Sequence, residues 1–223
     1  MRLEVYLNAR GERRFVGLLE ERGGDILFEY DKRFLDPKRT FDGLFGVFND
    51  SLPDGWGLLL LDRLLRRSGL PLERITPLSR LSLVGSGGMG ALEYEPVTPD
   101  PEPLPERIDL DGVAEEAWRT LNEDPLPVET LRTLMALNGS SCGARPKIMV
   151  RVSGDRRLIV PDAVAEPGCD PWLIKFPARH DDPAIGRMEY ACSLAAKRAG
   201  IEMPDTARFP GRDGAAYFGV RRF

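Results

Sequence analysis

Residues 138–147 (NGSSCGARPK) have the composition of a phosphate-binding loop. Small residues let backbone N–H groups approach phosphate oxygens closely, and the hydroxyl groups of Ser140 and Ser141 are further donors. Arg145 and Lys147 add positive charge at the end of the stretch. The same composition is also common in flexible turns, so it leaves both interpretations open.

Lys175 lies inside an apolar segment, residues 172–176 (WLIKF), whose pattern predicts a β-strand. A buried ammonium group without an anionic partner is costly. Either Lys175 therefore faces anions, such as a nucleotide phosphate and a carboxylate, or it points to solvent from an edge strand.

A second glycine-rich stretch, residues 85–90 (GSGGMG), satisfies the pattern G-x-G-x-x-G. A dinucleotide-binding fold needs a strand before this pattern and a helix after it. Residues 91–96 (ALEYEP) instead alternate like a strand, which favours a structural turn. The alternative, a dinucleotide-binding protein, predicts a parallel sheet.

The overall composition excludes several classes of site. His180 is the only histidine and stands in a polar stretch, so we expect an exposed loop residue and neither a histidine-based zinc site nor a Ser-His-Asp triad. The formal charge of -4 comes from interspersed charges, which makes direct DNA binding by this chain unexpected. The sequence shows no evident signal peptide or membrane-spanning segment. Because the cysteines also lack CxxC spacing, we expect a cytoplasmic protein. The cysteines are Cys142, Cys169 and Cys192.

The elements that carry these residues fall into two domains. Alternation predicts strands near residues 3–7, 15–19 and 25–30, and helical spacing predicts a helix over residues 51–68 with Trp56 as a buried anchor. Proline then occupies every second position in a short stretch, which favours extended backbone and marks a linker. We place the domains at residues 1–98 and 107–223, with the linker at 99–106.

The second domain is predicted to contain helices, strands, one further helix and a final strand. The expected segments are residues 108–122 and 128–138 (helices), 147–152, 157–161 and 172–176 (strands), 189–199 (helix) and 215–222 (strand). The fold class is therefore α+β, with a small antiparallel sheet and helices in the first domain.

Several blocks of the sequence resemble the HipA family and occur in the family's order. They are FNDSLPDGWG (48–57), GMGAL (88–92), GARPK (143–147), WLIKFP (172–177), MEY (188–190), AGIEMP (199–204) and VRRF (220–223). The resemblance covers nearly the whole chain. It implies an accessory N-terminal domain followed by the N-terminal lobe of a protein-kinase-like domain.

The resemblance also implies an activity and partners. Members of the family are serine/threonine kinase toxins of type II toxin–antitoxin systems that phosphorylate a protein substrate, typically an aminoacyl-tRNA synthetase, and are linked to persistence. They bind a HipB-like DNA-binding antitoxin. ATP and Mg²⁺ are the expected cofactors.

By the same resemblance, the glycine-rich loop and the strand lysine bind ATP. The expected ATP-binding residues are Ser140, Ser141, Cys142, Gly143, Ala144, Arg145, Lys147 and Lys175. Glu189, on the following helix, is expected to orient Lys175 as kinases pair a strand lysine with a helix glutamate. Ser140 falls where the family carries a regulatory autophosphorylation site.

The catalytic base and the magnesium carboxylates of kinases belong to the C-terminal lobe, which the resemblance places after Phe223. We therefore expect no catalytic residue and no metal ligand in this chain, and negligible turnover by the chain alone. The alternative is a non-catalytic interaction or inhibitory module that binds a partner kinase or an antitoxin.

Overall fold

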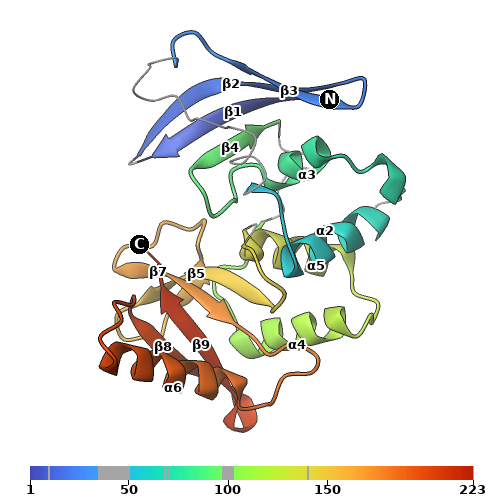
Figure 1. Ribbon diagram of the computed structural model, residues 1–223. Coiled ribbons are helices and arrows are strands. Elements are labelled where there is room, and N and C mark those ends of the chain that lie inside the picture. The colour runs from blue at the N-terminus through green and yellow to red at the C-terminus, as the bar shows by residue number, and fades with distance from the viewer. Residues whose placement is uncertain are drawn as a thin grey trace. The chain divides into compact units, whose positions relative to one another are not determined.

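The computed structural model describes residues 1–9, 11–34, 51–67, 69, 71–96, 103–139 and 141–222. The chain divides into two compact units, Met1–Pro101 with Gly139–Cys142 and Glu102–Asn138 with Gly143–Phe223. Each unit has its own antiparallel sheet (Figure 1), and the described residues include five α-helices. The predicted α+β class is therefore confirmed.

The sheet of the first unit contains β1 (Arg2–Ala9), β2 (Glu12–Arg22), β3 (Asp25–Tyr30) and β4 (Leu92–Glu95), in the order β3-β2-β1-β4. Alternate side chains of β1 and β2 point into the core, among them Leu3 and Val5, which are fully buried. Helix α3 (Pro77–Val84) adds Leu78 and Leu81 to the same core. The three strands predicted for the start of the chain are confirmed.

The helices of the first unit differ in part from the prediction. Helix α2 (Trp56–Arg67) begins five residues after the predicted start, and Trp56 is buried as expected. Sequence reasoning missed α3, which follows the short 3₁₀ turn η1 (Leu72–Arg74). A capping box starts α3: the Ser79 amide donates to Oγ1 of Thr76, and the Thr76 amide donates to Oγ of Ser79.

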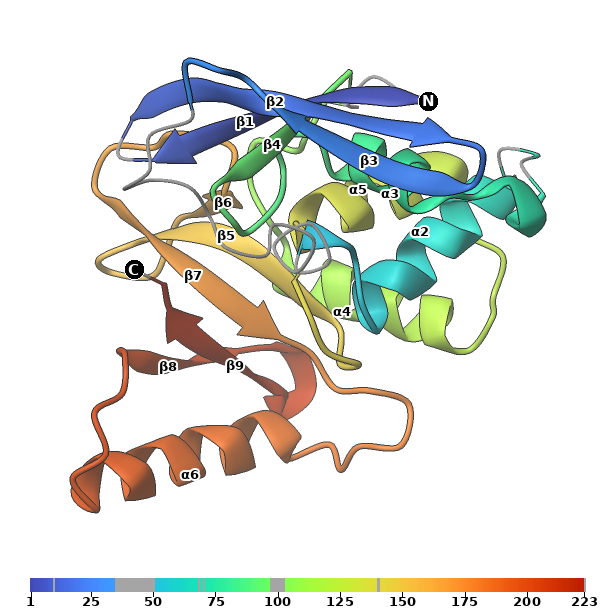
Figure 2. The same ribbon diagram turned by 45° about the horizontal axis from the view of Figure 1, so that its top comes forward.

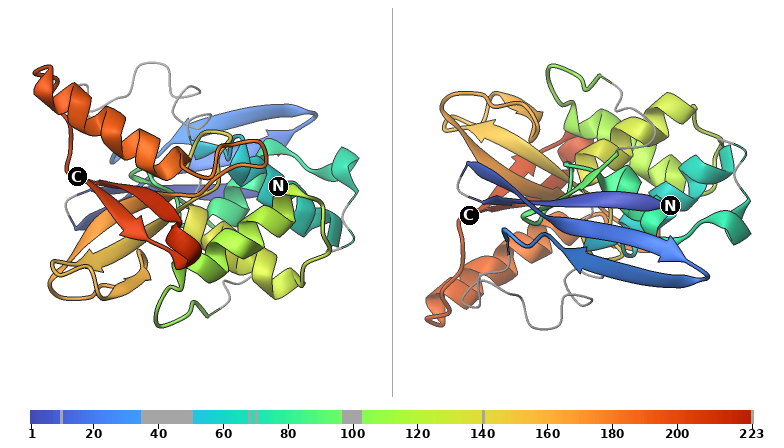
Figure 3. Two further views of the ribbon diagram at one scale, coloured as in Figure 1. Left: turned by 90° about the horizontal axis from the view of Figure 1, so that it is seen from below. Right: turned by 90° about the horizontal axis from the view of Figure 1, so that it is seen from above.

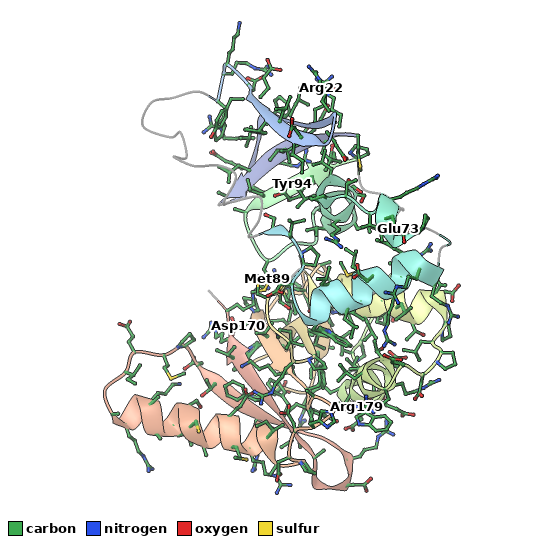
Figure 4. All side chains as sticks on the ribbon, turned by 45° about the vertical axis from the view of Figure 1, so that its right-hand side comes forward. Arg22, Glu73, Met89, Tyr94, Asp170 and Arg179 are labelled. Atoms are coloured by element: carbon green, nitrogen blue, oxygen red, sulfur yellow. The ribbon has the colours of Figure 1, made fainter. Side chains whose placement is uncertain are left out.

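The glycine-rich stretch 85–90 connects α3 to β4, which pairs antiparallel with β1. Gly85 ends α3 with a positive φ of 54°, and Met89 and Tyr94, labelled in Figure 4, mark the turn and the strand after it. A dinucleotide site requires a helix after the glycines and a parallel sheet. The structure therefore excludes the dinucleotide alternative and confirms the structural turn.

The sheet of the second unit has the order β6-β5-β7-β9-β8. Its strands are β5 (Lys147–Ser153), β6 (Ile159–Pro161), β7 (Cys169–Lys175), β8 (Thr206–Pro210) and β9 (Ala216–Arg221). Every pairing is antiparallel, and β7 lies between β5 and β9. The four predicted strands are present. Sequence reasoning missed β8, which is joined to β9 by the 3₁₀ turn η2 (Arg212–Gly214).

Three helices accompany this sheet: α4 (Leu110–Leu121), α5 (Val128–Asn138) and α6 (Ile185–Arg198). The bounds of α5 are as predicted, and Gly139 follows it with a φ of 55°. Helix α6 begins four residues before the predicted start. None of the helices in the described part of the chain is both long and apolar enough to cross a membrane.

Two neighbouring residues of β9 show that α4 and α6 lie on opposite faces of the sheet (Figures 2 and 3). Successive side chains of a strand point to opposite faces. Tyr217 donates a hydrogen bond to Asp111 at the start of α4, with 2.6 Å between the oxygens. The neighbouring Phe218 points to the α6 side, because its ring lies 5.4 Å from Nζ of Lys175, which pairs with Glu189 of α6. A Cβ atom at Gly186 of this helix would clash with the carbonyl oxygen of Ala216. Helix α6 therefore rests directly on the backbone of β9.

Candidate phosphate-binding site

Two lysines face the same side of the second sheet. Lys147 at the start of β5 and Lys175 at the end of β7 are direct register partners, and such partners project from the same face. Lys147 is 5% exposed, and its Nζ donates to the carbonyl oxygen of Gly143 at 3.1 Å. Like charges directly opposite each other destabilise a sheet, so anions are expected nearby.

Glu189 of α6 supplies one of these anions. Its Oε1 lies 3.3 Å from Nζ of Lys175. The ring of Phe218 on β9 lies 5.4 Å from the same Nζ, within the range of a cation–π interaction. Because β7 is an interior strand, the alternative of an edge-strand lysine is wrong. The Lys175 side chain is 30% exposed, so part of this paired side chain is in contact with solvent.

Arg145 links the glycine-rich loop to two acidic residues. Its guanidinium forms a two-pronged ion pair with Asp181, with distances of 2.8 Å from Nε to Oδ2 and 3.0 Å from Nη2 to Oδ1. Its Nη1 donates to Oε1 of Glu189 at 3.2 Å. Glu189 is therefore shared by Arg145 and Lys175, and four charged side chains form one network.

The network changes the acidity of its members. Hydrogen bonds from Arg145 and from the Ala178 amide, with the positive charge of Arg145, hold the pKa of Asp181 below its usual value despite partial burial. The hydrogen bond to Asp181 and the negative charges of Asp181 and Glu189 raise the pKa of Arg145. Both groups therefore stay ionised at neutral pH.

Gly186 explains how α6 brings Glu189 within reach of Lys175. A Cβ atom at Gly186 would clash with the carbonyl oxygen of Ala216 on β9. The missing side chain lets the first turn of α6 lie against the strand, and Glu189 follows three residues later. Arg187 also donates to the carbonyl oxygen of Gly214 in the turn before β9.

Gly143 shapes the loop around Lys147. Its φ of 104° is a conformation that favours glycine, and a Cβ atom there would lie only 2.9 Å from Nζ of Lys147. The Lys147 ammonium therefore lies so close to Gly143 that the Cβ atom of any other residue would obstruct it. Gly143, Arg145 and Lys147 thus belong to one compact arrangement.

The remaining predicted loop residues have different surroundings. Ser141 is 2% exposed, whereas Cys142 and Ala144 are exposed. Ser140 lies outside the described residues, so its predicted autophosphorylation stays a prediction. The binding roles of the loop residues stay predictions as well.

Asp181 is the member of the network that sequence reasoning missed. It lies in the loop between β7 and α6, which also contains Arg179, labelled in Figure 4. The neighbouring His180 is exposed, as predicted. The sequence shows two adjacent aspartates here, Asp181 and Asp182, and no local signal shows which of them turns toward Arg145.

Among the described residues, no group of three or more histidine, cysteine, aspartate or glutamate side chains is arranged to hold a metal ion. Asp181 and Glu189 are both engaged by cations of the protein. Arg145, Lys147 and Lys175 are the cations of this part of the sheet, and their side chains have the chemistry of anion-binding residues.

The sequence matches two domains of one protein family. Residues 3–95 match the HipA N-terminal domain, and residues 139–223 match the HipA-like C-terminal domain. The chain belongs to the HipA family. The HipA-like C-terminal match contains the whole charged network, including Asp181. No curated protein and no solved structure matches this HipA-family chain significantly.

Proposed function

We propose that the chain binds ATP as part of a HipA-like serine/threonine kinase toxin of a type II toxin–antitoxin system. The ATP phosphates would lie against residues 143–147 and Lys175. Glu189 would hold the Lys175 ammonium in position, as a helix glutamate does in protein kinases.

The observation that carries this proposal is the 3.3 Å ion pair between Lys175 of an interior strand and Glu189 of the helix on the same face. An ion pair that only stabilised the fold would require no charged residue besides Lys175 and Glu189. Here Lys147 lies directly opposite Lys175 and Arg145 contacts the same carboxylate. Three cations, Arg145, Lys147 and Lys175, thus lie close to the carboxylates of Asp181 and Glu189, and a phosphate group would add a further anionic partner for Lys175.

The residues fit a phosphate chain better than they fit a metal. The exposed part of Lys175 would admit phosphate oxygens. ATP would supply the phosphoryl group, and the residues of this chain would bind and orient its phosphates. The proposal assigns no magnesium ligand and no catalytic base to the described residues.

Calorimetric titration of the chain with ATP tests the proposal. Lys175→Met is expected to weaken ATP binding about tenfold, the loss of about 1.4 kcal/mol typical of one charged contact. Lys197→Met is the matched control, because Lys197 lies in the last turn of α6 and pairs only loosely with Asp205 at 3.9 Å. Equal affinity of the two variants, or no ATP binding by the unmodified chain, would contradict the proposal.

The family context supplies the biological proposal. The phosphorylated partner would be a protein, with an aminoacyl-tRNA synthetase as the first candidate, and the regulatory partner would be a HipB-like antitoxin. A cytoplasmic location follows from those partners. Incubation of the chain with ATP, Mg²⁺ and the candidate synthetase would test phosphoryl transfer separately from ATP binding.

A second candidate function is that of a non-catalytic module that binds a partner kinase or an antitoxin. The exposed apolar side chains of α6 and the turn after it favour it: Met188 is 53% exposed, Leu194 40% and Ile201 58%. If this function is the correct one, Met188→Glu is expected to abolish binding of a HipA-type kinase or antitoxin and leave ATP affinity unchanged. Binding of both partners unaffected by Met188→Glu would count against it.

A further inference from the structure

Glu189 accepts contacts from two cations at a single oxygen. Oε1 lies 3.2 Å from Nη1 of Arg145 and 3.3 Å from Nζ of Lys175. Two cations at one carboxylate oxygen compete, because each weakens the attraction that the other receives. A shift of the Arg145 guanidinium toward Glu189 would therefore weaken the ion pair between Lys175 and Glu189.

Asp181 restricts that shift. Its two carboxylate oxygens accept hydrogen bonds from Nε and Nη2 of Arg145, and Nη1 is the nitrogen that contacts Glu189. Asp181 is itself fixed, because Oδ2 also accepts a hydrogen bond from the Ala178 amide at 2.8 Å. The Asp181 side chain is 16% exposed, and a two-pronged pair with arginine has a defined geometry.

We infer that Asp181 is a positioning residue that acts through Arg145 to keep Lys175 paired with Glu189. The inference rests on the proposed function in one respect, because that function makes the Lys175–Glu189 pair part of a nucleotide-binding site. Without the carboxylate of Asp181, Arg145 would turn its guanidinium fully onto Glu189 and displace the Lys175 ammonium. Without Arg145, Lys175 would hold Glu189 alone.

The rate at which an amine-reactive acylating reagent labels Lys175, measured by mass spectrometry, reports this competition without any nucleotide. Asp181→Asn keeps the size of the side chain and removes its charge. It is expected to raise the labelling rate of Lys175 by about two- to fivefold, the factor that corresponds to a partly exposed ion pair. Arg145→Met is expected to lower the rate by a similar factor. Lys197 is the internal reference and should label equally in all variants.

The double variant decides whether Asp181 acts through Arg145. In the Arg145→Met background, Asp181→Asn is expected to leave Lys175 labelling at the level of Arg145→Met alone. An equal rise in both backgrounds, or no rise in either, would overturn the inference. Faster labelling of Lys175 in Arg145→Met would overturn it as well, even if Asp181→Asn failed to fold.

Measurement of ATP affinity is a second, independent test of the role of Asp181. Asp181→Asn is expected to weaken ATP binding by the same factor of about two to five. Asp155→Asn, which breaks an exposed pair with Arg157 at 3.9 Å, is the matched control and should bind as the unmodified chain does. Absence of ATP binding by every variant, with the labelling pattern as expected, would overturn the proposed function and leave the role of Asp181 supported.

Discussion

Lys147 and Lys175 lie directly opposite each other on β5 and β7, with their side chains on one face of the sheet. The repulsion between them is offset on one side by the carbonyl oxygen of Gly143 and on the other by Glu189. We propose that a bound phosphate group would offset this repulsion further.

Glu189→Gln tests the carboxylate directly. The substitution removes the charge that Lys175 and Arg145 share, and we expect the free energy of unfolding to fall by about 1 kcal/mol, because these pairs are partly exposed. ATP affinity should also fall, since Lys175 loses its anchor. Glu202→Gln, at an exposed position after α6, is the control and should change neither quantity. Denaturant unfolding and calorimetry check the two effects; unchanged ATP affinity in Glu189→Gln would count against the assigned role.

Gly186→Ala tests the docking of α6. The added methyl group would meet the carbonyl group of Ala216, so the helix must move away from β9. We expect a loss of stability of about 1–3 kcal/mol, the usual cost of overpacking. Gly154→Ala is the control, because a Cβ atom there meets no atom within 4 Å. If urea unfolding gave the same midpoint for both variants, the close packing of α6 on β9 would be refuted.

The pH dependence of stability tests the pair between Arg145 and Asp181. Because the pKa of Asp181 is lower in the folded chain, the folded chain binds fewer protons there than the unfolded chain does. The stabilisation is therefore present above the unfolded pKa of about 3.9 and is lost as the pH falls through the folded value. The difference in unfolding free energy between the unmodified chain and Asp181→Asn should be constant from about pH 7 to 5 and shrink below about pH 4. A difference that does not shrink in acid would contradict the ionised pair.

Sequence reasoning located the elements with strong periodic signals. The apolar alternation of residues 25–30 and the helical spacing of residues 128–138 predict β3 and α5 with their observed bounds. It missed β8, whose residues Thr206–Pro210 contain an arginine and end in proline, because pairing with β9 stabilises this strand more than its own composition does. It also missed α3, in which a Thr76–Ser79 capping box replaces the more familiar acidic residue.

The candidate site was predictable only in part. Lys175 and Glu189 could be paired from a family resemblance, since each lies on an element with a clear pattern. Asp181 could not, because its role depends on how the loop after β7 folds back toward Arg145. A loop carries no periodicity from which to infer the direction of a side chain.

Hydrogen–deuterium exchange of the chain with and without saturating ATP tests the central claim most directly. We expect slower exchange in peptides that cover residues 141–150 and 172–178, where the loop and the end of β7 would contact the phosphates. Peptides from β2 and β3 should exchange at the same rate in both conditions. Protection confined to other segments, or no change at ATP concentrations that saturate the calorimetric signal, would contradict the assignment of this loop and Lys175 as the phosphate site.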